Sequence, residues 1–276
     1  MRLVTGPFET ERAARVPSVA RPLAGVAATA VLGAGAGLAA EAGFGAPGGI
    51  GHALASGSVQ AGLLAAGWVV ALDGREGWRG PALRGAAALV LAAVAARVSP
   101  AGALAYLVVP LVLAREAGGW RGDVERIGWR APRAPGAILL GAAAGTFLGL
   151  HLLFAASLTL GYAVSVPEGG RYLAALAYDV GANALTAEWL FRGAIFSALW
   201  RRWSFWPAAA ASTGCALARY LLDPTLPRAI EAMAGATFYL LLLGFACCAL
   251  RAWSGSLVPG YFATVAFFAA YRMLLV

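Results

Sequence analysis

The densest set of polar side chains within the apolar runs of this chain lies between residues 178 and 193. It contains Asp179, Asn183, Glu188 and Arg192. Ionisable groups are costly in the hydrocarbon of a membrane, so such a set is a candidate for function. Glu188 and Arg192 are four residues apart and can pair on one helix face, whereas nine residues at 100° each place Asp179 on the face opposite Glu188. The spacing leaves open whether the ion pair fixes helix packing or serves a functional site.

Two further polar residues are expected at the depth of Glu188. The midpoint between Glu188 and Arg219 falls at a short turn near Trp203, so two antiparallel helices would place both residues about 20 Å from that turn. Thr264, nine residues into the last apolar run, lies at a comparable level. His151 lies inside another apolar run, where a lone histidine is more typical of a hydrogen-bonded packing residue than of a metal ligand. We therefore expect three helices to bring polar positions to one level.

The composition places these residues in a membrane protein. Of the 276 residues, 61% are hydrophobic and 12% are charged, about half the charged fraction of a soluble domain, and the mean hydropathy is +0.74. The net charge of +8 comes from arginines that punctuate the apolar runs instead of forming one stripe, which argues against nucleic acid as a partner. The expected partner is the lipid bilayer.

Nine apolar runs predict an all-α, polytopic transmembrane bundle. Eight spans are the alternative, because Arg97, Ser99 and Pro100 divide the third run from the fourth, and one weak segment could be re-entrant. Arginine is concentrated in alternate loops, which predicts a multi-pass protein of the cell membrane with a cytoplasmic N-terminus and an external C-terminus. The runs are 22–40, 53–72, 80–96, 98–114, 136–163, 172–200, 204–222, 232–250 and 255–275.

The same pattern divides the chain into four parts. Residues 1–21 form a cytoplasmic N-terminal segment, and residues 22–114 form the N-terminal transmembrane helices. Residues 115–135 form the longest basic loop, which is expected to lie against the anionic inner leaflet. Residues 136–276 form a C-terminal transmembrane domain.

Three short segments of the C-terminal half resemble the motifs of one family. Residues 187–193, Ala-Glu-Trp-Leu-Phe-Arg-Gly, resemble the Glu-Glu-x-x-x-Arg and Gly motif of the CPBP intramembrane metalloproteases. The family's Phe-x-x-x-His motif falls on residues 215–219, and its His-x-x-x-Asn motif falls on residues 264–268 after a typical lead-in at 255–260. The loop 126–130 is similar to a signature found upstream of this domain. The resemblance covers roughly residues 120–276.

The resemblance implies the fold and the active-site residues of the family, but this chain has different residues at most of the active-site positions. The family includes type II CAAX prenyl endopeptidases and bacteriocin-processing or immunity proteins, and its active members are thought to activate water with paired glutamates and two histidines. The corresponding positions here are Ala187, Arg219 and Thr264, and the family asparagine is replaced by Phe268. Glu188 and Arg192 alone match. The resemblance therefore implies a degenerate member.

Three functions follow from this comparison. The first is a catalytically silent, hydrolase-like pseudoenzyme with neither metal nor cofactor, in which a salt bridge replaces the metal site and a membrane peptide or protein is the partner. The second is an active intramembrane endopeptidase in which His151, Asp179 or Asn183 lines the site around Glu188. The third is small-solute transport or partner binding, although the sequence has no convincing inverted repeat. Whether the chain is an enzyme stays open at this point.

Overall fold

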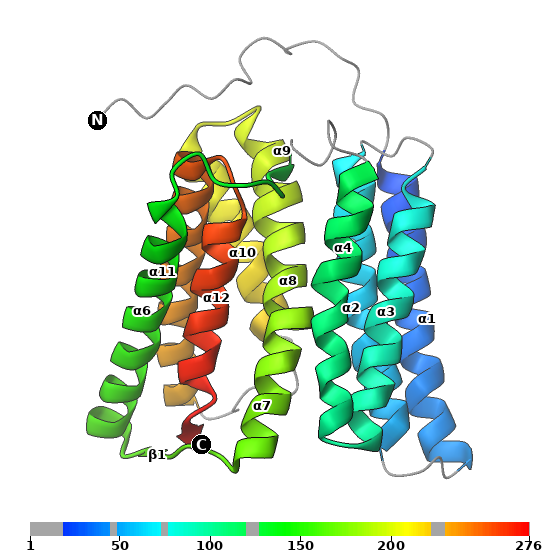
Figure 1. Cartoon of the computed structure of the whole chain (residues 1–276), viewed down its shortest axis with the longest axis horizontal. Coiled ribbons are helices and arrows are strands. Elements are labelled where there is room, and N and C mark those ends of the chain that lie inside the picture. Colours follow the sequence, from blue (N-terminus) through cyan, green and yellow to red (C-terminus); the bar gives the residue numbers. More distant parts are fainter. Residues whose placement is uncertain (1–18, 45–48, 73–76, 120–126, 222–229, 276) are drawn as a thin grey trace. The chain divides into compact units, whose positions relative to one another are not determined.

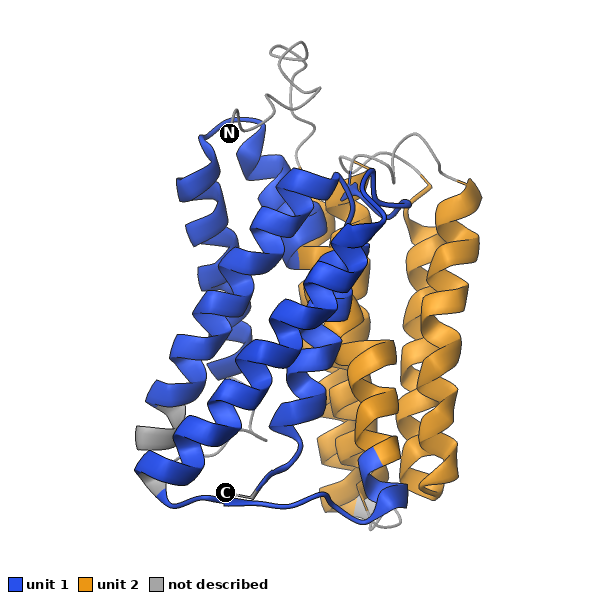
Figure 2. Cartoon of the chain, turned by 60° about the vertical axis from the view of Figure 1, so that its left-hand side comes forward, with its two compact units in different colours: residues 1–13, 127–172, 191–276 blue, residues 14–126, 173–190 orange. Residues whose placement is uncertain are grey.

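The chain folds into α-helices in a computed structural model that describes residues 19–44, 49–72, 77–119, 127–221 and 230–275 (Figure 1). The helices form two compact units, coloured separately in Figure 2. Among the described residues, 127–172 and 191–275 form unit 1, and 19–119 and 173–190 form unit 2. The predicted N-terminal segment lies largely outside the described residues, as does the middle of the basic loop at 120–126.

Unit 2 is built mainly from consecutive antiparallel helices. α1 packs on α2, α2 on α3, and α3 on α4, while α8 adds its contacts to α2. Ser99 is extended (φ −156°, ψ 153°) and interrupts the helix before Pro100, as expected of a residue that precedes proline. The elements are α1 (Ala20–Phe44), α2 (Ile50–Ala71), α3 (Arg79–Val98), the 3₁₀ helix η2 (Ala101–Leu107), α4 (Val108–Gly119), most of α7 (Gly169–Tyr178), the π-helix η3 (Asp179–Asn183) and α8 (Ala184–Ala187).

Unit 1 is a second set of packed helices, in which α6 packs on α12 and α11 contacts α6, α10 and α12. Two short antiparallel strands pair Ala163 with Leu275 and Val164 with Leu274, so they join the end of α6 to the end of the chain. The elements are α6 (Gly136–Leu160), β1 (Ala163–Val164), most of the π-helix η4 (Glu188–Phe196), α9 (Ser197–Trp200), α10 (Phe205–Leu221), α11 (Ile230–Ser254), α12 (Val258–Tyr271) and β2 (Leu274–Leu275).

Glycines let α6 and α12 approach closely. A Cβ atom added at Gly141 would overlap the backbone of Pro259, and one added at Gly145 would overlap the backbone of Ala263. The two glycines are four residues apart and therefore lie on one face of α6. Lipid supplies no hydrophobic drive for helix association, so close backbone packing at small residues stabilises such an interface.

The expected all-α polytopic bundle is confirmed, and the protein is a multi-pass integral membrane protein. In the part of the chain that the structure describes, six helices are long and apolar enough to cross a membrane: 20–43, 50–71, 79–98, 100–119, 136–159 and 234–254. The other three predicted runs fold as shorter or interrupted helices, namely α7 to α9, α10 and α12. All nine runs thus fall on helical segments, and the count of nine spans stays a prediction.

Candidate functional site

The helix that carries Glu188 is not a uniform α-helix. Between α7 and α9 it changes to π-helical geometry twice, at η3 and again at η4. A π-turn closes i→i+5 hydrogen bonds and therefore contains more residues than an α-turn. The count of 100° per residue, which put Asp179 opposite Glu188, does not apply to this segment. Both carboxyl side chains are completely buried.

Unit 2 contains a buried polar network around the first π-turn. Asn183 Nδ2 donates a hydrogen bond to Asp179 Oδ1 at 3.0 Å. Thr186 Oγ1 donates to Gln60 Oε1 at 2.6 Å, and Gln60 Nε2 donates to Tyr178 Oη at 2.9 Å. These bonds join α2 to the helix of Glu188. Sequence reasoning missed Gln60, although a glutamine inside an apolar run was a signal that could have found it.

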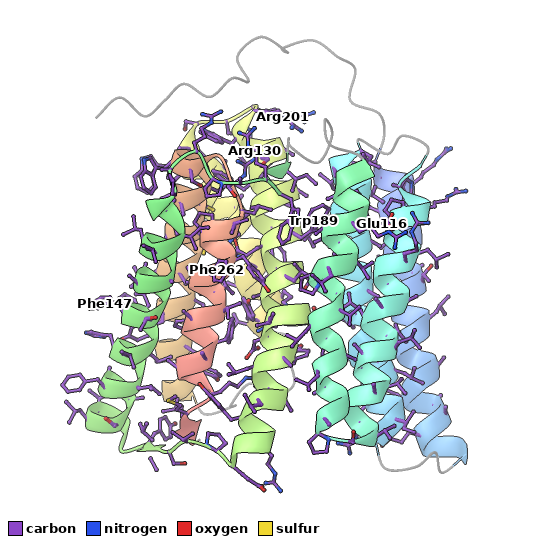
Figure 3. All side chains as sticks on the ribbon, viewed as in Figure 1. Glu116, Arg130, Phe147, Trp189, Arg201 and Phe262 are labelled. Carbon is purple, nitrogen blue, oxygen red and sulfur yellow. The ribbon has the colours of Figure 1, made fainter. Side chains whose placement is uncertain are left out.

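Ala187 and Glu188 follow this network, and both are fully buried in unit 2. The next residue, Trp189, packs its ring against that of Trp68 with centroids 5.0 Å apart; Figure 3 labels Trp189 on the ribbon. The methyl group of Ala187 cannot coordinate a metal or transfer a proton. The first position of the family motif therefore supplies neither a metal-binding nor a proton-transferring side chain.

Arg192 belongs to unit 1 and is also buried. A Cβ atom added at Gly244 of α11 would lie 3.1 Å from Arg192 Nη2, so the absence of a side chain there leaves room for the guanidinium. On the preceding residue, the carbonyl oxygen of Phe191 accepts a hydrogen bond from Ser212 Oγ at 2.7 Å. Helices α10 and α11 thus both contact this part of η4.

The other motif positions of unit 1 lie in a packed aromatic and apolar environment. The half-buried Arg219 places its guanidinium over the ring of Tyr220, 4.6 Å from the centroid. The ring of Tyr220 in turn lies 5.5 Å from that of Phe268. Thr264 Oγ1 is 3.6 Å from Cys247 Sγ. The structure therefore brings the positions of Arg219 and Phe268 together around Tyr220.

His151 lies elsewhere on unit 1. Its side chain is exposed on α6, and its Nδ1 shares a hydrogen bond with Tyr239 Oη of α11 at 2.5 Å. This contact agrees with the expectation that His151 is a hydrogen-bonded packing residue. A role for His151, Asp179 or Asn183 in lining an active site stays a prediction.

Two segments that resemble family features, the loop before α6 and the turn at 255–260, meet at one end of unit 1. Leu257 N donates to Gly128 O at 2.8 Å, and Arg133 N donates to Ser254 O at 3.0 Å. The loop before α6 is thereby joined to the turn between α11 and α12. Backbone hydrogen bonds thus hold these two segments together.

Comparison with known proteins gives one family match in the C-terminal half of the chain. Residues 169–268 match the family model described as type II CAAX prenyl endopeptidase Rce1-like. No curated protein and no solved structure gave a significant match. The matched region contains all three motif segments recognised in the sequence, so the resemblance is confirmed. Residues 169–268 are therefore similar to the CAAX prenyl endopeptidases, and this match supports membership of the CPBP family.

Proposed function

We propose that this protein is a catalytically silent member of the CPBP family. The observation that carries the proposal is the packing at the third motif, where Phe268 and Thr264 replace the asparagine and histidine of active relatives. Phe268 is buried against Tyr220, and Thr264 is buried beside Cys247. Both motif positions serve helix packing in unit 1.

The residues at the motif positions do not fit a divalent metal ion. A catalytic zinc site needs three protein ligands and an open position for water. Ala187 and Phe268 have no donor atom, and the guanidinium of Arg219 stays protonated and repels a cation. Among the described residues, no three His, Cys, Asp or Glu side chains are grouped so that they could hold a metal ion. The lack of metal ligands at these positions thus supports the proposal that the protein is catalytically silent.

A salt bridge is the proposed replacement for the metal site. Glu188 is fully buried, and a carboxylate buried at membrane depth needs a compensating cation. Arg192, four residues away, is one candidate and Arg219 is the other; an arginine can bind a carboxylate through two parallel hydrogen bonds. We expect the Glu188 carboxylate to lie within about 6 Å of at least one of these guanidinium groups. An experimental structure with both groups farther away would contradict the salt bridge.

One observation favours the second candidate, an endopeptidase that depends on Glu188. The π-helix η4 begins at Glu188 and includes Arg192, and π-turns occur frequently at functional sites. Under this alternative, His151, Asp179 or Asn183 supplies the missing polar groups.

Metal binding separates the two candidates. Zinc content is measured in the detergent-purified protein and in the triple variant Ala187→Glu, Arg219→His, Thr264→His, which restores the family residues. We expect zinc in the wild type to equal the content of Glu188→Ala, and the triple variant to bind more. A stoichiometric zinc in the wild type that Glu188→Ala removes would refute the silent assignment.

The proposed setting is the cell membrane, with the N-terminus in the cytoplasm and a membrane peptide or protein as partner. The arginine distribution supports this orientation. Cysteines placed in the loop 115–135 should react with a membrane-impermeant reagent only after the cells are opened. Labelling of that loop from outside intact cells would refute the topology.

A further inference from the structure

Three arginines meet where the loop before α6 contacts the turn between α11 and α12. Arg130 Nε donates a hydrogen bond to Gly255 O at 3.0 Å. A Cβ atom added at Gly255 would lie 2.9 Å from Arg130 Nη2 and 3.3 Å from Arg133 Nε, and one added at Gly128 would overlap the guanidinium of Arg251. Both glycines have positive φ, 96° at Gly128 and 71° at Gly255. Their backbone therefore lies against the guanidinium groups without a side chain between them.

The three side chains differ in depth. Arg133 is exposed and Arg130 is half-buried, whereas Arg251 is only 4% exposed. Arg251 Nη2 donates to Ser197 Oγ at 3.5 Å. Arg130 and Arg133 are both close enough to repel the charge of Arg251. The three guanidinium groups thus range from an exposed one to a buried one.

The surroundings add positive potential to these three arginines. In the described part of the chain, neither Arg130 nor Arg133 forms an ion pair. Helices α6 and α12 both begin beside the cluster, at Gly136 and Val258, and helix N-termini favour anions. Holding three like charges together costs free energy that a bound anion would offset.

We propose that Arg130, Arg133 and Arg251 form a binding site for a phosphate group. The group is supplied either by the headgroup of an anionic phospholipid or by free phosphate. Guanidinium groups bind phosphate oxygens through paired, charge-assisted hydrogen bonds, and the loop lies on the face predicted to meet the anionic inner leaflet. The site is independent of Glu188 and of the proposed loss of catalysis.

A matched pair of variants tests the site in the purified full-length protein in neutral detergent. Arg130→Gln/Arg133→Gln removes two charges from the cluster. Arg201→Gln/Arg202→Gln removes two exposed charges from the turn before α10, and Figure 3 shows Arg130 and Arg201 at the same end of unit 1. Short-chain phosphatidylglycerol, phosphatidylcholine and inorganic phosphate are titrated separately, and the shift in thermal unfolding gives each apparent Kd.

We expect phosphatidylglycerol or phosphate to bind the wild type and to bind Arg130→Gln/Arg133→Gln about tenfold more weakly, because charge-assisted hydrogen bonds are lost. The control pair should change the Kd less than about twofold, because Arg201 and Arg202 are not part of the proposed site and would act on the anion only through a screened interaction. Binding of phosphatidylglycerol alone identifies a lipid headgroup, and equal binding of inorganic phosphate identifies a free anion.

Equal losses in the two double variants would overturn the proposal, and so would a wild type that binds neither anion. If Arg130→Gln/Arg133→Gln does not fold, the single variant Arg133→Gln tests the site instead. The side chain of Arg133 is exposed, so its replacement should not prevent folding. The unliganded melting temperature of Arg133→Gln should be no lower than that of the wild type, because one repelling charge is removed, while its Kd rises about threefold or more. An unchanged Kd would again overturn the site.

Discussion

Replacing Phe268 by alanine should destabilise the packing of unit 1. Phe268 is 6% exposed on α12, and its ring lies 5.5 Å from that of Tyr220 on α10. Phe262 on the same helix is 42% exposed (Figure 3) and provides the matched control. Lipid is as apolar as the bundle interior, so the loss comes from packing and not from transfer out of water.

The expected loss has two parts. The ring pair with Tyr220 contributes about 1 kcal/mol. A residual cavity of about 50 Å³ adds about 1.2 kcal/mol at the usual cost per unit of cavity volume. Phe268→Ala should therefore lower the free energy of unfolding by about 2 kcal/mol, and Phe262→Ala by less than about 0.5 kcal/mol.

The assay is reversible unfolding in mixed micelles, followed by circular dichroism, for both single variants. A double-mutant cycle with Tyr220→Ala should give a coupling energy of about 1 kcal/mol. Equal stability of Phe268→Ala and Phe262→Ala, or a coupling energy of zero, would refute the view that this motif position serves packing.

Three further predictions concern other contacts. Gly145→Ala should cost about 1 to 3 kcal/mol in the same unfolding assay because its Cβ would overlap the backbone of α12, whereas Gly136→Ala, with nothing within 4 Å, should change stability by less than about 0.5 kcal/mol; equal effects would contradict the close approach. Thr186→Val removes the hydrogen bond to Gln60 and should cost about 0.6 kcal/mol, and at most about 1.7 kcal/mol; a stabilised variant would argue against the network. Glu188→Gln should cost about 3 to 5 kcal/mol if the buried carboxylate is paired, and an unchanged thermal stability would show that the pair is not structural.

The fold was readable from the sequence because hydropathy and helix breaks determine it. Each apolar run falls on a helical segment, and the break at Ser99 and Pro100 lies where the sequence places it. The predicted end of the fifth helix was less accurate. The apolar run extends to residue 163, but α6 ends at Leu160, and Gly161 turns the chain with φ 66°. An apolar strand such as Ala163–Val164 is indistinguishable from helix by hydropathy alone.

The site was only partly predictable. The motif positions were identified by their resemblance to the family motifs. The π-turns of their helix leave no signature in hydrophobic periodicity, so the predicted faces of Asp179 and Glu188 assumed the wrong geometry. The hydrogen bond of Thr186 to Gln60 and the approach of Arg130 to Arg251 each join residues more than a hundred positions apart. Such contacts depend on tertiary packing, which local pattern does not encode.

Cleavage tests the central claim most directly. Wild-type protein and Glu188→Ala are incubated with membrane-peptide and prenylated-peptide substrates, with and without chelator, and the products are identified by mass spectrometry. A silent family member should give the same background for both proteins, with and without chelator, on each substrate. Chelator-sensitive cleavage by the wild type that disappears in Glu188→Ala would contradict the account and identify the protein as an active protease.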